Sequence, residues 1–218
     1  MLKKIFRSSK LSNDDMELFE QFKTSAEAFK QFTDYISAGR SLPALHLVKQ
    51  NNISYYRQKF GYSVLVETGT FLGDTVYAQK SFFKEIFSIE LSKDLFDKAK
   101  HRFRQDSNVT IINGDSGNVI SELIRKITEP AVFWLDGHYS EGITAKGNKN
   151  TPIVEEIEAI LSSSLPHGIL IDDARLFIGM DDYPTIDEIC ALVLSKDPKR
   201  YVTVSDDIIG IFQRTGFN

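Results

Sequence analysis

Apolar side chains recur every three or four positions along the first 60 residues, a spacing that predicts helices. One helix is expected between Asn13 and Ile36 and a second over Leu45–Phe60, which Gly61 ends. After Gly61 the pattern changes to short apolar runs, many of them β-branched, that alternate with amphipathic stretches. The chain is therefore expected to be helical up to residue 61 and mixed α/β beyond it.

Seven apolar runs are the expected strands: Ser63–Glu67, Ile86–Glu90, Val109–Ile112, Ala131–Asp136, Gly168–Asp172, Tyr201–Val204 and Ile208–Gln213. The expected helices among them are Gly73–Ser81, Ser92–Arg104, Asn118–Lys126, Pro152–Leu161 and Thr185–Leu194. Strands that lack a polar face and alternate with helices predict a parallel sheet covered on both sides. Residues 205–207 are too few for a crossover helix, so the last two strands are expected to form an antiparallel hairpin.

Length, composition and charge narrow the class of protein. The 218 residues are 42% hydrophobic and 26% charged, which is typical of a globular chain. A net charge of −4 argues against a dedicated nucleic-acid binder, and the single cysteine excludes an internal disulfide. No apolar run approaches the roughly 20 residues of a membrane span, and the basic N-terminus lacks the apolar core of a secretory signal. We expect a soluble, cytoplasmic protein with no nucleic-acid partner and no membrane association.

The helical N-terminal part is expected to belong to the same core as the rest. No Pro-, Gly- or Ser-rich linker precedes Ser63, so residues 1–61 are interpreted as a helical cap on residues 62–218. Amphipathic helices can pair two chains as readily as they cap one, so a homodimer is an open alternative.

The turn after the first expected strand carries the strongest chemical signal. Gly69 permits a sharp turn there, and Gly73 permits close packing of the next helix on the sheet. A dinucleotide site needs a glycine where Phe71 stands, and Asp74 adds a negative charge that would repel a pyrophosphate. S-adenosylmethionine has no phosphate and carries positive charge, which suits Glu67 and Asp74 better.

Polar side chains also follow the second and third expected strands. Glu90 is placed to accept hydrogen bonds from both ribose hydroxyls of a nucleoside. Asp115 and Ser116 follow the third strand and could contact an adenine amino group. Each residue alone is equally well an ordinary turn residue, but together they favour a nucleoside cofactor. The expected cofactor-binding residues are Glu67, Gly69, Thr70, Phe71, Gly73, Thr75, Glu90, Leu91, Asp115, Ser116 and Asp136.

These motifs resemble those of class I S-adenosylmethionine-dependent methyltransferases. The turn Glu67-x-Gly69-x-Phe71-x-Gly73 is similar to that of the catechol O-methyltransferase branch, and Glu90 and Asp115 match the next two motifs. The resemblance covers residues 62–213 and leaves the N-terminal part open. It implies a Rossmann-like, mostly parallel, seven-stranded sheet of order 3-2-1-4-5-7-6 with an antiparallel last strand.

The resemblance also brings three carboxylates together. Asp136 ends the fourth strand, while Asp172 and Asp173 end the fifth, which is its neighbour in this sheet order. Like charges so close are unfavourable unless they are protonated or bridged by a cation, and Mg²⁺ prefers oxygen ligands. The three positions resemble the metal ligands of catechol and macrocin-type sugar O-methyltransferases, which makes them the expected magnesium ligands. Adjacent aspartates are also common in turns, where one of them simply caps a helix.

The base that would accept the proton of the acceptor is less well defined. His138 follows Asp136 closely and its imidazole titrates near neutral pH, although a lone histidine more often has a structural role. The catechol enzymes place a lysine just after the corresponding aspartate, whereas here Lys146 lies further along the polar loop 141–151. That loop is either a substrate lid or an ordinary surface excursion. The expected catalytic residues are Asp136, His138 and Lys146.

The function that these observations favour is methyl transfer from S-adenosylmethionine to a hydroxyl of a small molecule or sugar, assisted by Mg²⁺. Two other classes stay open. One is a metal-independent methyltransferase acting on protein or RNA, and the other is a non-catalytic nucleoside-binding scaffold. A nicotinamide dehydrogenase is disfavoured by Phe71 and Asp74.

Overall fold

The structure is a computed structural model that describes residues 42–137 and 151–214, together with residues 27, 30, 31, 33–35 and 37–39. The chain divides into two compact units, Met1–Leu47 and Val48–Asn218. In the first unit the described residues between 27 and 37 are mostly helical, and Lys30 pairs with Asp34 at 2.6 Å. The sequence-based boundary at residue 61 stays a prediction.

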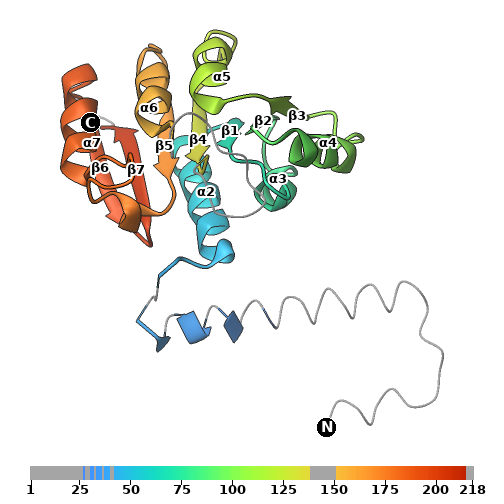
Figure 1. Cartoon of the computed structure of the whole chain (residues 1–218), viewed down its shortest axis with the longest axis horizontal. Helices are drawn as coiled ribbons and strands as arrows, with labels where there is room; N and C mark the ends of the chain where they lie inside the picture. Colours follow the sequence, from blue (N-terminus) through green and yellow to red (C-terminus); the bar gives the residue numbers. More distant parts are fainter. Residues whose placement is uncertain are drawn as a thin grey trace. The chain divides into compact units, whose positions relative to one another are not determined.

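The second unit is built on a seven-stranded sheet of order β3-β2-β1-β4-β5-β7-β6 (Figure 1). Its strands are β1 (Val64–Thr68), β2 (Glu85–Glu90), β3 (Val109–Asn113), β4 (Ala131–Leu135), β5 (Gly168–Ile171), β6 (Arg200–Ser205) and β7 (Ile208–Gln213). The first five strands pair in parallel, whereas β7 runs antiparallel to both β5 and β6. The predicted order and the antiparallel last strand are confirmed. Every residue of β1 and β4 is buried, as expected for strands covered on both faces.

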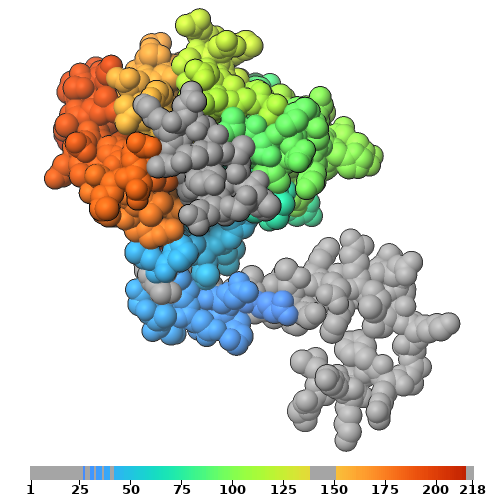
Figure 2. Space-filling view, in the orientation of Figure 1, coloured from blue at the N-terminus to red at the C-terminus, as the bar shows by residue number. Residues whose placement is uncertain are grey.

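Helices cover both faces of the sheet. They are α2 (His46–Phe60), α3 (Asp74–Gln79), α4 (Lys93–Arg102), α5 (Ser116–Leu123), α6 (Ile153–Leu161) and α7 (Ile186–Lys196), with a short 3₁₀ helix η2 (Ala174–Leu176) after β5. One apolar cluster joins α5, α6 and α7 to the sheet, and these helices lie side by side in Figures 1 and 2. A second cluster holds Ile53 of α2, Val76 of α3 and Phe103 after α4 against the opposite face.

Local sequence signals set several of the element ends. Gly61 ends α2 in the left-handed region at φ 72°, where a residue with a side chain would be strained. The hairpin between β6 and β7 turns through Asp206 and Asp207, both left-handed, as a two-residue turn of this kind requires. At α6 the expectation is wrong by one residue. Pro152, the expected first residue, is the N-cap, and the helix begins at Ile153.

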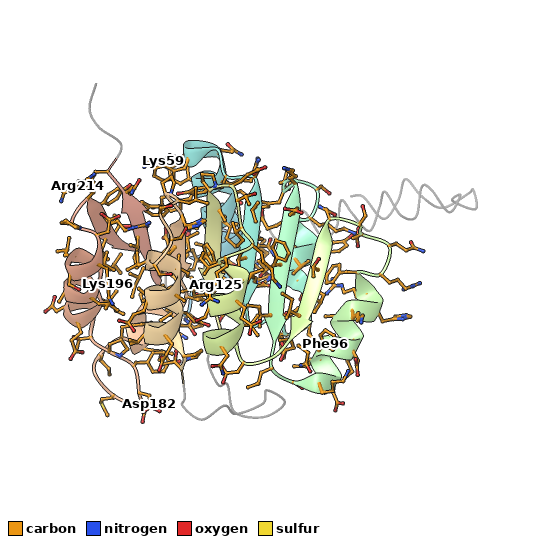
Figure 3. All side chains as sticks on the ribbon, turned by 90° about the horizontal axis from the view of Figure 1, so that it is seen from above. Lys59, Phe96, Arg125, Asp182, Lys196 and Arg214 are labelled. Atoms are coloured by element: carbon orange, nitrogen blue, oxygen red, sulfur yellow. The ribbon has the colours of Figure 1, made fainter. Side chains whose placement is uncertain are left out.

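The parallel strands end at one edge of the sheet. In Figure 3, Phe96, which follows β2, and Asp182, which follows β5, lie toward one end of this unit, whereas Lys59 lies toward the other. The loops after β1 to β5 therefore gather at a single end, which is where open α/β sheets bind ligands. No described helix is long and apolar enough to cross a membrane.

Candidate active site at the carboxyl ends of the strands

The glycine turn after β1 is held tightly against its neighbours. The amides of Gly69 and Thr70 donate to the carbonyl of Ile89 on β2, at 2.9 and 3.2 Å. Gly69 is left-handed at φ 83°, and a Cβ there would overlap the backbone carbonyl of Asp136. Gly73, at φ 79°, is the N-cap of α3, and a Cβ would lie 2.6 Å from the Phe103 ring. Both glycines are therefore required by backbone geometry as well as by close packing.

Glu90 fastens this turn to the next one. Its Oε2 accepts from the Phe71 amide at 2.8 Å, and its Oε1 accepts from the Ser92 amide, also at 2.8 Å. The Glu90 side chain is buried at 5% exposure. Beside it, Phe71 and Leu91 expose 41% and 38% of their surfaces. Glu90 thus has a defined orientation, and each of its oxygens has a lone pair left for another donor.

Glu67 lies beneath the turn and not at the surface of the site. It is 2% exposed and accepts a hydrogen bond from Ser88 Oγ, which in turn lies 2.6 Å from Thr70 Oγ1. Burial raises the pKa of Glu67 to about 8, against the opposing effect of the hydrogen bonds from Ser88 and Thr75. Asp74, expected to face a cationic ligand, instead pairs with Arg102 at 2.8 Å.

The residues after β3 take structural positions next to a buried acid. Asp115 is the N-cap of α5, where its Oδ1 accepts from the Gly117 amide at 3.0 Å. Ser116 is buried and hydrogen bonds to Glu156 of α6, which is only 1% exposed. Burial raises the pKa of Glu156 to about 7, although hydrogen bonds from Ser116 and Thr68 work against the rise. Glu156 was not among the residues expected from the sequence, although it lies three positions after Ile153 and four before Ile160, a helical spacing that marks it as facing inward.

The acidic cluster contains a cation that belongs to the protein. Lys49 Nζ of α2 forms an ion pair with Asp172 Oδ2 and lies 3.6 Å from Asp173 Oδ1. Burial by itself would lower the pKa of Lys49, but the charges of Asp172, Asp136 and Asp173 together raise it. Lys49 therefore remains an ammonium at neutral pH. Asp136, Asp172 and Asp173, which were expected to converge, all interact with the same group, and this group is the ammonium of Lys49.

A second basic group extends this arrangement toward the β6–β7 hairpin. Arg175 Nη1 lies 2.7 Å from Asp173 Oδ1 and also pairs with Asp207 Oδ2. The Asp207 carboxylate accepts from the Arg175 amide as well, at 2.9 Å. Positive and negative groups thus alternate from the hairpin turn to helix α2, in the order Asp207, Arg175, Asp173, Lys49 and Asp172.

The predicted magnesium site does not fit this arrangement. Asp172 and Asp173 direct oxygens at Lys49 and Arg175, and the part of the chain that the structure describes contains no group of three His, Cys, Asp or Glu side chains able to hold a metal. Lys49 and Arg175 already occupy the positions beside Asp172 and Asp173 that a cation would take, and they offset part of the negative charge of the cluster. No step of the chemistry is therefore assigned to Mg²⁺.

The two candidate bases, His138 and Lys146, lie outside the described residues, so their roles stay predictions. Sequence reasoning also missed Lys49, Arg175 and Asp207. Lys49 gave a weak signal, because it lies four positions before the apolar Ile53 on the same helix face. Nothing in the sequence pairs that lysine with an aspartate 123 positions later.

Solved structures share this fold. A methyltransferase of Podospora anserina bound to S-adenosylhomocysteine aligns with a TM-score of 0.59 and 16% identity, over 96% of this chain and all of that one. An S-adenosylmethionine-bound O-methyltransferase of Streptomyces achromogenes, involved in tomaymycin synthesis, aligns with a TM-score of 0.57 and 16% identity, over 99% of this chain and 94% of that one. A Bacillus cereus O-methyltransferase bound to S-adenosylhomocysteine gives 0.55 and 13%, over 97% and 95%.

At these identities the likeness establishes the fold, which is the Rossmann-like methyltransferase fold that the resemblance implies. No protein-family model matches the sequence, and no curated protein matches it either.

Proposed function

We propose that the chain is an S-adenosylmethionine-dependent methyltransferase whose acceptor is a hydroxyl group of a small molecule or sugar. The observation that carries the cofactor is the bond from the Phe71 amide to Glu90, which joins the glycine turn after β1 to a buried acid at the end of β2. The O-methyltransferases among the structures of the same fold support oxygen as the acceptor atom.

The residues present fit such a cofactor. Gly69, without a Cβ, keeps the turn close to the end of β4, and Glu90 keeps one lone pair on each oxygen for two ribose hydroxyls. Phe71, whose amide bonds Glu90, and the adjacent Leu91 expose apolar surface, which suits a nucleoside. Asp115 and Ser116 lie at the start of α5, where an adenine amino group is expected, although Asp115 also caps the helix. Thr70, Gly73 and Thr75 act by holding the turn.

S-adenosylmethionine, held by the turn after β1 and by Glu90, would supply an electrophilic methyl group. The sulfur–carbon bond would break as the oxygen–carbon bond forms, S-adenosylhomocysteine would leave, and the hydroxyl proton would pass to a general base, for which His138 and Lys146 are the candidates. The protein contributes by positioning the acceptor oxygen in line with the methyl group. The acceptor would lie near the ends of β4 and β5, next to the charged groups of Asp136, Asp172, Asp173 and Lys49. We propose methyl transfer without Mg²⁺ because Lys49 takes the position beside Asp172 and Asp173 that the ion would need.

The first test is calorimetric titration of the full chain with S-adenosylhomocysteine, with NAD as the control ligand. The proposal expects one-to-one binding with a dissociation constant in the micromolar range and no binding of NAD. Glu90→Gln is the matched variant for the cofactor, and Glu85→Gln, exposed at the opposite end of the same strand, is its control. Absence of binding to the wild-type chain would leave the fold without its cofactor and favour the scaffold alternative.

The acceptor is tested separately once binding is established. A panel of small phenols, vicinal diols and sugars is incubated with the protein and S-adenosylmethionine, and S-adenosylhomocysteine is measured by chromatography. Turnover with any hydroxyl compound supports O-methylation. Turnover confined to RNA or protein substrates would support the alternative class of methyltransferase instead.

A further inference from the structure

The packing of helix α2 against the core and against α3 holds Lys49 at the acidic cluster. Ile53, one turn after Lys49 on the same face, is fully buried in the cluster that contains Leu170 of β5. Gln79 of α3 donates to the carbonyl of Gln50 at 3.1 Å and accepts from Ser54 at 3.3 Å. The position of the ammonium is therefore set by the core and by a buried amide.

The surroundings of this ammonium are those of a bound cation. The Lys49 side chain is 18% exposed, the Asp172 side chain is fully buried, and Asp173 is 9% exposed. Asp136 adds its charge from the end of β4. An isolated buried carboxylate is strongly unfavourable, so these acids need a nearby positive charge in order to stay ionised.

We propose that Lys49 is the resident cation of this site and takes the place that a divalent metal holds in metal-dependent enzymes of the same fold. The role of Lys49 in methyl transfer rests on the proposed function, whereas its pairing with Asp172 and Asp173 does not. An ammonium group has three N–H donors, and here Asp172 takes one while Asp173 lies close by, so Lys49 has fewer positions open to an acceptor than a metal that chelates two hydroxyls. An acceptor at this site therefore needs only one hydroxyl, and not the vicinal diol that a metal would favour.

A metal and Lys49 exclude each other here. Mg²⁺ requires oxygen ligands at about 2.0–2.1 Å in near-octahedral geometry. Asp172 Oδ2 and Asp173 Oδ1, the oxygens nearest to Lys49, are the ones that such an ion would need. If the ammonium is removed, Asp172 loses its counter-charge and Asp173 keeps only Arg175. Asp172 Oδ1, which is buried without a hydrogen-bond partner among the described residues, then becomes a further ligand.

The test measures Mn²⁺ binding, because bound and free Mn²⁺ are distinguished directly by electron paramagnetic resonance. We expect no binding to the wild-type chain up to about 1 mM Mn²⁺. Lys49→Met should bind Mn²⁺ at concentrations at least tenfold below that limit, and the further change Asp172→Asn should abolish this binding. Lys49→Arg keeps the positive charge and serves as the matched control, so it should behave as the wild type does. The midpoint of thermal unfolding should rise on adding Mg²⁺ for Lys49→Met alone.

Two results would overturn the proposal. One is stoichiometric Mn²⁺ binding by the wild-type chain that Asp172→Asn removes, because a metal then occupies the site despite Lys49. The other is the absence of Mn²⁺ binding in both Lys49→Met and Lys49→Gln when circular dichroism shows them folded. If Lys49→Met folds only with Mg²⁺ present, the metal has replaced the ammonium and the proposal stands. Titration of the same preparations with S-adenosylhomocysteine reports on the proposed function independently.

Discussion

Lys49 of helix α2 forms an ion pair with Asp172 at the end of β5, 123 positions later in the chain. The pair joins a helix that lies outside the sequence resemblance to the edge of the sheet where the acceptor is expected. Burial and the charge of Asp173 raise the pKa of Asp172, and Lys49 opposes that rise. Whether Asp172 is ionised therefore depends on Lys49, a residue from the N-terminal part of the second unit.

Replacement of Glu90 by glutamine should weaken cofactor binding and also lower stability, because one backbone amide loses its carboxylate acceptor. The amide keeps the shape of the side chain but can accept from only one of the two backbone amides that Glu90 now bonds, those of Phe71 and Ser92. Hydrogen bonds to a charged acceptor contribute about 1.5–3 kcal/mol, so S-adenosylhomocysteine should bind roughly 10- to 100-fold more weakly. Calorimetry measures the loss. Equal affinity of Glu90→Gln and Glu85→Gln would contradict the role given to Glu90.

Glu156 should make the folded state less stable as the pH rises. Its pKa is raised from 4.5 to about 7, so between these values the folded chain binds more protons than the unfolded chain, and stability falls with increasing pH. A rise of that size corresponds to about 3 kcal/mol. Glu156→Gln should remove this slope and gain stability relative to the wild type between pH 5 and pH 8, as measured by urea unfolding.

The matched control for Glu156 is Glu158→Gln, on the exposed side of the same helix, where Glu158 pairs with Lys196 at 2.9 Å. This variant should keep the pH dependence of the wild type. The interpretation fails if both variants show the same slope, because the pH effect then arises from other groups.

His167 should make the folded state less stable as the pH falls, which is the opposite of the effect of Glu156. It is fully buried, its Nδ1 accepts from the Ala131 amide at 3.0 Å, and burial with the nearby charge of Arg200 lowers its pKa to about 4. The unfolded chain binds the proton first, so stability falls as the pH drops from about 6.5 through 4. His167→Asn keeps an acceptor for Ala131 but does not titrate. The loss of stability between pH 7 and pH 4.5 should therefore be smaller in His167→Asn than in the exposed control His101→Asn.

The sheet could be predicted because each of its determinants is local in the sequence. The strands are short apolar runs, the turn residues Gly61 and Gly69 are where the backbone is left-handed, and Asp206 with Asp207 leaves room only for a hairpin. The order of the strands came from the resemblance to a known family, and the structure confirms it.

The site was predicted less completely, because charge balance depends on distant residues. Asp172 and Asp173 were correctly placed at one edge of the sheet, but their partner Lys49 comes from a helix whose docking no local pattern encodes. Glu156 differs in part: its spacing from Ile153 and Ile160 puts it on the apolar face of α6, whereas its hydrogen-bond partners Ser116 and Thr68 are distant in the sequence. An acidic cluster in a sequence thus indicates a cation nearby and does not say whether that cation is a metal or a side chain.

A comparison of Gly69 with Gly61 separates the effect of backbone strain from that of steric overlap. Gly69 and Gly61 are both left-handed, at φ 83° and 72°, so an alanine at either position should lose about 1 kcal/mol of stability. A Cβ at Gly61 meets nothing within 4 Å, whereas at Gly69 it would overlap the Asp136 carbonyl. Gly61→Ala should therefore bind S-adenosylhomocysteine as the wild type does, and Gly69→Ala should bind it at least tenfold more weakly. If the two variants bind equally well, the close approach of the turn to β4 is not needed for the cofactor.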